Sequence, residues 1–122
     1  FVVNMVTEEI VEAMNATAQS VHSDIDEFEL AGLTPLPSVK IKPPRVKESP
    51  ITFECEVVHH YSLENHKYGG ATMVVGRIVM FHFDEAVLLE DYKINLDVYR
   101  PVSRLAGANY SKLGELFAVK RG

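Results

Sequence analysis

At 122 residues the chain is long enough for one domain with a single hydrophobic core. Its apolar content of 47% and charged content of 24% are ordinary for a globular protein, and its formal net charge of −5 gives no general attraction to nucleic acid or to an anionic membrane. Cys55 is the single cysteine, which excludes an internal disulfide framework and suits a reducing compartment. No apolar run is long enough to span a bilayer. We therefore expect a cytoplasmic protein with no nucleic-acid or membrane partner.

The chain opens on FVVNMV, a short β-branched and apolar run that predicts a buried strand over residues 1–6. Residues 7–20 then show the spacing of an amphipathic helix, with Thr7 as its predicted N-terminal cap. Natural domains seldom begin on a core strand. We therefore expect either that residues before Phe1 have been removed or that the chain is the second part of something larger.

A second short helix is predicted between Ser23 and Gly32. Asp24 or Asp26 can cap its start, Gly32 can end it, and Pro35 prevents its continuation.

Five prolines lie between Pro35 and Pro50, and they predict that residues 35–50 form an extended connector rather than a central strand. This connector also carries four cations close together: Lys40, Lys42, Arg45 and Lys47. A solvated basic loop is the preferred interpretation of these cations. The alternative is a local contact with an anion or a phosphate.

The clearest alternation of the sequence lies in residues 51–63. The apolar side chains share one predicted face: Ile51, Phe53, Cys55 and Val57. The polar side chains share the opposite face: Thr52, Glu54 and Glu56. This pattern predicts a strand, in which Cys55 is a small buried hydrophobe rather than a reactive thiol.

The Gly69-Gly70 pair predicts a hairpin turn after that strand, because glycine permits positive φ. Residues 72–84 then predict a second long strand, in which Gly76 marks a bulge or a close approach to the backbone. Together these elements predict a mainly antiparallel β fold with two or three small helices, either a barrel or a sandwich.

The C-terminal part carries weaker signals. Residues 85–102 predict a short strand, a loop and a turn of helix, and Ser111–Leu116 predicts a short helical piece. The small-residue loop LAGAN lies between Arg104 and Tyr110. It could admit a ligand, with Arg104 supplying charge and Tyr110 a ring or a hydroxyl. The alternative is a tight structural turn in which Tyr110 covers the core.

Three histidines flank the predicted hairpin turn: His59, His60 and His66. Adjacent strand residues point to opposite faces, so His59 and His60 cannot easily bind one ion, and the sequence has no C-x-x-C spacing. We therefore expect no metal site. His66, in the turn, is either exposed or faces a ligand, where an imidazole can act as a proton donor near neutral pH.

Five blocks of the sequence, taken in order, resemble flavin reductase-like proteins over nearly the whole chain. They are FVVNMVTEEIVEAMNATA, DEFELAGLTPLPS, IKPPRVKESPITFECEV, MVVGRIVMFHFDEAVL and YRPVSRLAGANYSKLGELF. The resemblance implies an antiparallel split β-barrel of the FMN-binding type. The chain resembles the C-terminal portion of that fold, with the N-terminal part and its flavin-phosphate contacts lacking.

The resemblance also implies a function, that of an FMN-dependent NAD(P)H:flavin oxidoreductase or a fragment of one. Flavin, as FMN or alternatively FAD, carries the redox chemistry, and NAD(P)H is the co-substrate that delivers a hydride. Relatives form homodimers, and some serve as the reductase component of a monooxygenase. Two alternatives stay open: a non-enzymatic FMN-binding electron carrier of the same fold, and a truncated, self-associating domain without cofactor.

The resemblance further implies a set of cofactor-binding residues, whereas no catalytic residue can be named. The segment RLAGANY stands where relatives show Arg-Leu-Gly-Gly-x-x-Tyr, with an alanine in place of one glycine. Thr34, in AGLTP, matches a polar position that approaches the flavin ring in relatives. His66, in the turn, stands at a position similar to that of a histidine implicated in nicotinamide handling in shorter members of the family. The predicted set is Arg104, Gly107, Tyr110, Thr34 and His66. Asn4 is expected to be a structural hydrogen-bonding residue.

Overall fold

The computed structural model describes residues 1–63 and 69–122 of the chain. In chain order the elements are β1 (Val2–Asn4), α1 (Val11–Ala16), α2 (Glu27–Ala31), β2 (Pro35–Leu36), β3 (Arg45–Val46), β4 (Ile51–Leu63), β5 (Ala71–Phe83), the 3-10 turn η1 (Glu85–Val87), α3 (Leu96–Tyr99), β6 (Val102–Arg104) and β7 (Tyr110–Lys112). The described fold is mainly β with short helices, as the sequence predicts.

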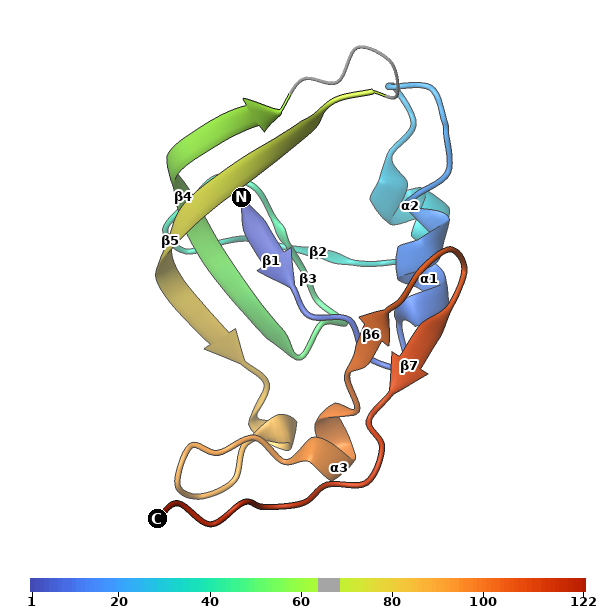
Figure 1. The fold of residues 1–122 in the computed structure, drawn as a ribbon. Coiled ribbons are helices and arrows are strands. Elements are labelled where there is room, and N and C mark those ends of the chain that lie inside the picture. Colours follow the sequence, from blue (N-terminus) through green and yellow to red (C-terminus); the bar gives the residue numbers. More distant parts are fainter. Residues whose placement is uncertain (64–68) are drawn as a thin grey trace.

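The largest sheet has three antiparallel strands in the order β1-β4-β5 (Figure 1). The opening strand is present as β1, which pairs with β4 and places Val3 opposite Phe53, but it is shorter than predicted and is not buried, since Val3 is 36% exposed. The backbone of Phe1 extends this pairing, since its carbonyl accepts from the amide of Cys55 and its amino group donates to the Cys55 carbonyl. The predicted hairpin is also present, with β4 paired to β5 along its length.

The second predicted helix is confirmed as α2. The side chain of Asp26 accepts a hydrogen bond from the amide of Phe28 and so caps its start. Gly32 ends α2 in the left-handed conformation, with φ of 67°. The predicted cap of the first helix is wrong. Thr7 is buried and bridges Pro101, while α1 begins after Ile10 with no side-chain cap.

The polar face of β4 is buried at Thr52 and Glu54, contrary to a simple reading of its alternation, and becomes exposed at Glu56. Thr52 is 1% exposed and Glu54 is 0% exposed, whereas Phe53 on the opposite face is only half-buried. The reason is long-range, because the proline-rich segment folds back against this face. There its backbone amides at Val39, Lys40 and Ile41 bond Glu54. Within the segment, the two-residue strands β2 and β3 pair with each other as a separate antiparallel ribbon.

Gly76 lies where another part of the chain approaches the backbone, as the sequence predicts. A Cβ built on Gly76 would lie 2.7 Å from Cε1 of the Phe1 ring and 3.2 Å from Cβ of Cys55. The strand register also shifts next to Gly76, between Val57 and His59 of β4. Both features explain why this position takes no side chain.

Substituting Gly76→Ala is expected to destabilise the fold by about 1–2 kcal/mol, because the new methyl group displaces the Phe1 ring and crowds Cys55. Chemical denaturation measures the change. The double variant Phe1→Ala/Gly76→Ala is the matched control. A Gly76→Ala penalty that is the same with and without the Phe1 ring would contradict this explanation.

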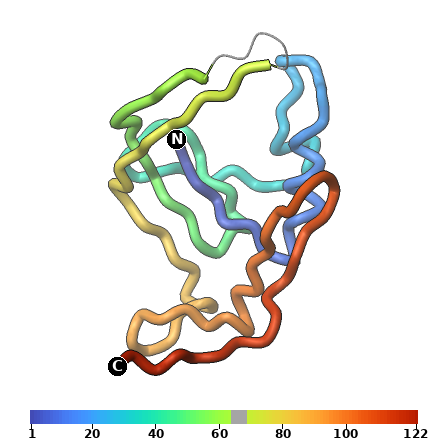
Figure 2. Tube along the Cα trace, in the orientation of Figure 1, coloured from blue at the N-terminus to red at the C-terminus, as the bar shows by residue number. Residues whose placement is uncertain are grey.

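The C-terminal segment returns to the start of the chain. The amide of Val102 donates to the Val6 carbonyl, and the amide of Glu8 donates to the Arg100 carbonyl, so the two segments lie side by side, as the tube in Figure 2 also shows. Glu8 reinforces this contact through Arg100 and through Lys112 at 3.1 Å. The pKa of Glu8 is lowered from its ordinary value, and the hydrogen bond from Lys112 is the main cause.

Two predictions for the C-terminal part are wrong. The strand predicted after residue 84 is the 3-10 turn η1, which Asp84 caps through the amide of Ala86, although the predicted turn of helix is present as α3. The helix predicted over Ser111–Leu116 is instead strand β7 followed by an extended tail, because pairing with β6 satisfies its backbone.

Few apolar side chains are buried in the described fold. The buried hydrophobic residues are Ile10, Ile51, Cys55 and Val87. The distal half of the β4–β5 hairpin leaves both of its faces exposed, with Val57, Tyr61 and Met73 each more than half exposed. No helix in the described part of the chain has the length and apolar character needed to cross a bilayer.

Candidate functional site

Three of the five predicted site residues meet at the tip of the β6–β7 hairpin. Arg104 ends β6 directly opposite Tyr110, the first residue of β7. Nη2 of Arg104 donates to the carbonyl of Gly107 at 3.4 Å. Gly107 has φ of 63° and nothing within 4 Å of where its Cβ would lie. The structure therefore brings Arg104, Gly107 and Tyr110 together at one turn, and their role in holding a cofactor stays a prediction.

The turn between these strands is closed by its own backbone. The amide of Leu105 donates to the Asn109 carbonyl at 2.8 Å, and the amide of Asn109 donates to the Ala106 carbonyl at 3.3 Å. Arg104 is exposed and Tyr110 is half-buried. The hairpin tip thus carries an exposed cation, a half-buried aromatic side chain and a glycine with open space beside it.

Thr34 lies elsewhere, beside the β2–β3 ribbon. Its amide donates to the carboxylate of Glu48 at 3.0 Å, and its carbonyl accepts from the amide of Lys47 at 2.9 Å. Burial raises the pKa of Glu48, but the hydrogen bonds from Thr34 together with its own backbone amide and the charge of Lys47 lower that pKa overall. The backbone of Thr34 is therefore committed to the ribbon, and no hydrogen bond described in the structure joins Thr34 to the β6–β7 hairpin. His66 lies outside the described residues.

Sequence reasoning missed the most elaborate polar cluster, which surrounds Glu54. Its carboxylate accepts from the amides of Val39 at 2.9 Å, Lys40 at 2.6 Å and Ile41 at 3.2 Å, and from Nε2 of His82. Burial raises the pKa of Glu54, but the bonds from His82 and the three amides outweigh it and lower the pKa to about 2. Glu54 is therefore an ionised internal anchor at neutral pH.

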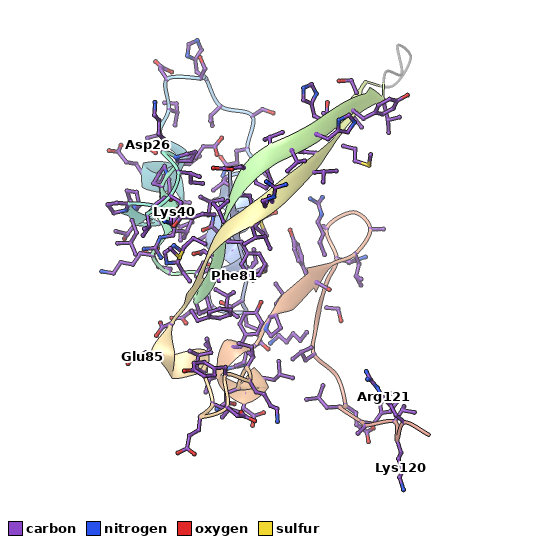
Figure 3. The ribbon with its side chains drawn as sticks, turned by 90° about the vertical axis from the view of Figure 1, so that its left-hand side faces the viewer. Asp26, Lys40, Phe81, Glu85, Lys120 and Arg121 are labelled. Atoms are coloured by element: carbon purple, nitrogen blue, oxygen red, sulfur yellow. The ribbon has the colours of Figure 1, made fainter. Side chains whose placement is uncertain are left out.

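The Glu54 anchor bears on the basic loop predicted from the sequence. Consecutive amides pointing at one place form an anion-binding concavity. In this chain the amides of Val39, Lys40 and Ile41 are occupied by an internal carboxylate, so they cannot at the same time hold a phosphate. The exposed Lys40 side chain lies on the same side of the sheet as Asp26 of the α2 cap (Figure 3).

An aromatic cluster occupies the opposite face of the sheet. The rings of Phe53 and Phe81 meet edge to face with centroids 5.1 Å apart, and Phe81 stacks with Phe83 at 6.3 Å. Phe81 is 53% exposed and Phe83 is 42% exposed. This cluster is a ready apolar wall for a planar ligand or for another polypeptide segment.

A metal ion would need several converging donors. Within residues 1–63 and 69–122, no three His, Cys, Asp or Glu side chains come together in that way.

Comparison with known families shows which part of the chain matches a family of known fold. A sequence model described as "Flavin reductase like domain" matches residues 1–100. The chain belongs to the flavin reductase-like family. The matched range contains Thr34 and the Glu54–His82 pair but ends before the β6–β7 hairpin. The family match therefore does not reach Arg104, Gly107 and Tyr110, whose assignment to a cofactor site is a proposal.

Solved structures of flavin reductase-like proteins share the fold. Nitrilotriacetate monooxygenase component B from Bacillus cereus is 38% identical, with a TM-score of 0.86 over 97% of this chain and 58% of its own. The 2-nitrobenzoate 2-nitroreductase NbaA of Pseudomonas fluorescens is 30% identical, with a TM-score of 0.81 over 100% of this chain and 59% of its own. A putative flavin reductase with split barrel domain from Shewanella frigidimarina has a TM-score of 0.80. The fold is thus the flavin reductase split barrel.

Among curated proteins, YwrF of Bacillus subtilis is 39% identical over 99% of this chain. The match covers 60% of YwrF, so the chain spans about three fifths of the length of the relatives that it matches.

Proposed function

We propose that the protein is an FMN-dependent oxidoreductase that transfers a hydride from NAD(P)H to flavin. The observation that carries this proposal is the 38% identity to nitrilotriacetate monooxygenase component B, over 97% of this chain and with a TM-score of 0.86. A fold alone does not specify a function, so the proposal also needs residues that suit a flavin.

The residues at the tip of the β6–β7 hairpin suit a flavin. When bound, FMN supplies the redox chemistry by taking up the hydride. Arg104 would direct its charge at a polar edge or phosphate of the cofactor, and the Tyr110 ring would cover an apolar part of it. Gly107 leaves open space where a side chain would obstruct the ligand. Thr34 and His66 remain in the proposed set from the family resemblance alone.

The aromatic cluster on the sheet would contribute differently. Phe81 and Phe83 are half exposed, and an apolar wall of this kind excludes water from a reduced cofactor. Hydride transfer competes with side reactions in water, so the protein's part is to orient the cofactor and to keep the site dry.

We further propose that the functional form is a homodimer. The distal β4–β5 hairpin leaves apolar side chains exposed on both faces, and apolar surface of this kind is typically covered in an assembly. A second copy is the partner we propose for it.

The physiological partner in this proposal is a monooxygenase component, because the similar protein from Bacillus cereus is itself a monooxygenase component. The reduced flavin would then be the product passed on. We place this activity in the cytoplasm, where the free thiol of Cys55 stays reduced.

The proposal is tested by titrating the 122-residue chain with FMN and then measuring NAD(P)H oxidation with and without added flavin. FMN binding together with flavin-dependent NADH or NADPH oxidation is the expected result. Binding without oxidation would replace the proposal by a non-enzymatic electron carrier. A chain that binds no FMN and only self-associates would rule out both.

A further inference from the structure

A groove of about 420 Å³ lies between strand β3, the start of β4 and the end of β5. Its lining residues are Leu36, Arg45, Lys47, Ser49, Pro50, Thr52, Phe81, His82, Phe83 and Asp84. The groove is separate from the β6–β7 hairpin, none of whose residues line it. Its volume is within the range of sites that bind small molecules.

Two of the four cations of the basic segment line this groove. Arg45 lies in β3 and Lys47 in the turn that follows it, and both residues line the groove. Arg45 donates from Nε to the Pro37 carbonyl at 3.3 Å, a bond that does not use its two Nη groups. Those groups form the fork that suits an oxyanion. Lys40 and Lys42 do not line the groove.

The second, independent observation is a buried hydroxyl without a partner. Thr52 lines the groove, is 1% exposed, and its Oγ1 has no hydrogen bond in the described structure. An unpaired buried hydroxyl is costly and rare in a folded protein. By contrast, the neighbouring Ser49 hydroxyl is hydrogen-bonded to the carbonyls of Met5 and Ile51. An oxygen of a bound anion would give Thr52 the acceptor that the protein does not supply.

The other polar groups of the groove are already engaged. His82 is bonded through Nε2 to Glu54. The carboxylate of Asp84 accepts from the amide of Ala86 as the cap of η1 and keeps its negative charge. The charged side chains that line the groove are therefore two cations, Arg45 and Lys47, and one carboxylate, Asp84.

We propose that this groove binds a phosphate group, with Arg45 and Lys47 supplying the charge and the Thr52 hydroxyl donating a hydrogen bond. The ligand is either free inorganic phosphate or the phosphomonoester of a small molecule. The proposal does not depend on flavin binding, and it accounts for two of the four cations of residues 35–50, Arg45 and Lys47.

The test is thermal unfolding of the 122-residue chain in inorganic phosphate and in phenyl phosphate, each against chloride at the same ionic strength. Both phosphates are expected to raise the unfolding midpoint, because a ligand that binds only the folded state stabilises it. A larger rise with phenyl phosphate would identify a phosphomonoester as the ligand, and equal rises would identify the free anion. No rise with either compound would overturn the proposal.

Matched variants locate the effect. The double variant Arg45→Gln/Lys47→Gln is expected to weaken phosphate binding roughly tenfold or more. The control Lys40→Gln/Lys42→Gln removes the same amount of charge outside the groove and is expected to bind phosphate as the wild type does. If the first double variant does not fold, Lys47→Gln alone replaces it, since Lys47 is exposed. Equal losses in both pairs would indicate general charge screening and would overturn the proposal.

Thr52→Val gives a signature that general electrostatics cannot mimic. Without phosphate this variant is expected to unfold at a higher temperature than wild type, because it replaces an unpaired hydroxyl with a methyl group. With phosphate it is expected to gain less stability than wild type. A lower midpoint without phosphate, or an unchanged gain with it, would show that the Thr52 hydroxyl does not serve the anion.

Discussion

Glu54→Gln is expected to lower the thermal unfolding midpoint by about 10 °C. The amide side chain cannot accept from His82 and from all three amides of the loop at once, so buried donors lose their partner. The segment 39–41 then detaches from the sheet and exposes the polar face of β4. Circular dichroism at a series of temperatures measures the change.

The matched control is Glu56→Gln, two residues further along β4 and exposed. It removes the same charge from the same strand and is expected to leave the midpoint within a few degrees of wild type. If the two variants unfold at the same temperature, the anchoring role of Glu54 is wrong.

The pH dependence gives a second readout of the same group. The pKa of Glu54 is lowered from 4.5 to about 2 in the folded chain. Its stabilising contribution is therefore complete above pH 4.5 and is lost as the pH falls from 4.5 toward 2. The midpoint of the wild type should fall across this window, and the fall should be shallower in Glu54→Gln.

Arg104→Ala is expected to weaken FMN binding roughly tenfold, since the variant removes a charge-assisted hydrogen bond to the cofactor. Tyr110→Ala is expected to have a similar effect through the loss of its ring. Arg104 is exposed and its hydrogen bond to Gly107 is long, so the fold should survive the change. Quenching of FMN fluorescence during a titration measures the affinity.

Arg121→Ala controls for the loss of one positive charge. Arg121 and Lys120 lie far out on the C-terminal tail, away from the sheet and from the β6–β7 hairpin (Figure 3). The Arg121 variant should bind FMN as the wild type does. If Arg104→Ala matches it, the cofactor site does not include the hairpin, and the flavin proposal would have to rest on other residues.

Local signals in the sequence predicted the elements that local interactions determine. The cap at Asp26 and the left-handed Gly32 define α2 by themselves, and the alternation after Pro50 defines β4. The β6–β7 hairpin does not follow from these local signals, because the sequence predicts a short helical piece over Ser111–Leu116, where β7 begins to pair with β6.

The failures at Thr7 and Glu54 share a physical cause, which is a partner far away in the sequence. Thr7 has the side chain of a helix cap, but Pro101 pairs with it and buries it. Glu54 has the pattern of a solvent-facing strand residue, but a loop 14 residues earlier covers it. The contact between Glu54 and His82 could have been predicted from the strand pairing. Thr52 lies opposite His82 across the hairpin, and Glu54 follows two residues later on the same face.

The contact between Phe1 and Gly76 has a consequence for how the sequence can vary. The ring of Phe1 occupies the volume that a side chain at residue 76 would need. The sizes of these two residues are therefore reciprocally constrained, although 75 positions separate them. Among relatives aligned over both strands, a larger residue at position 76 should accompany a smaller one at position 1. A library that randomises both positions together should recover folded pairs that neither single library contains.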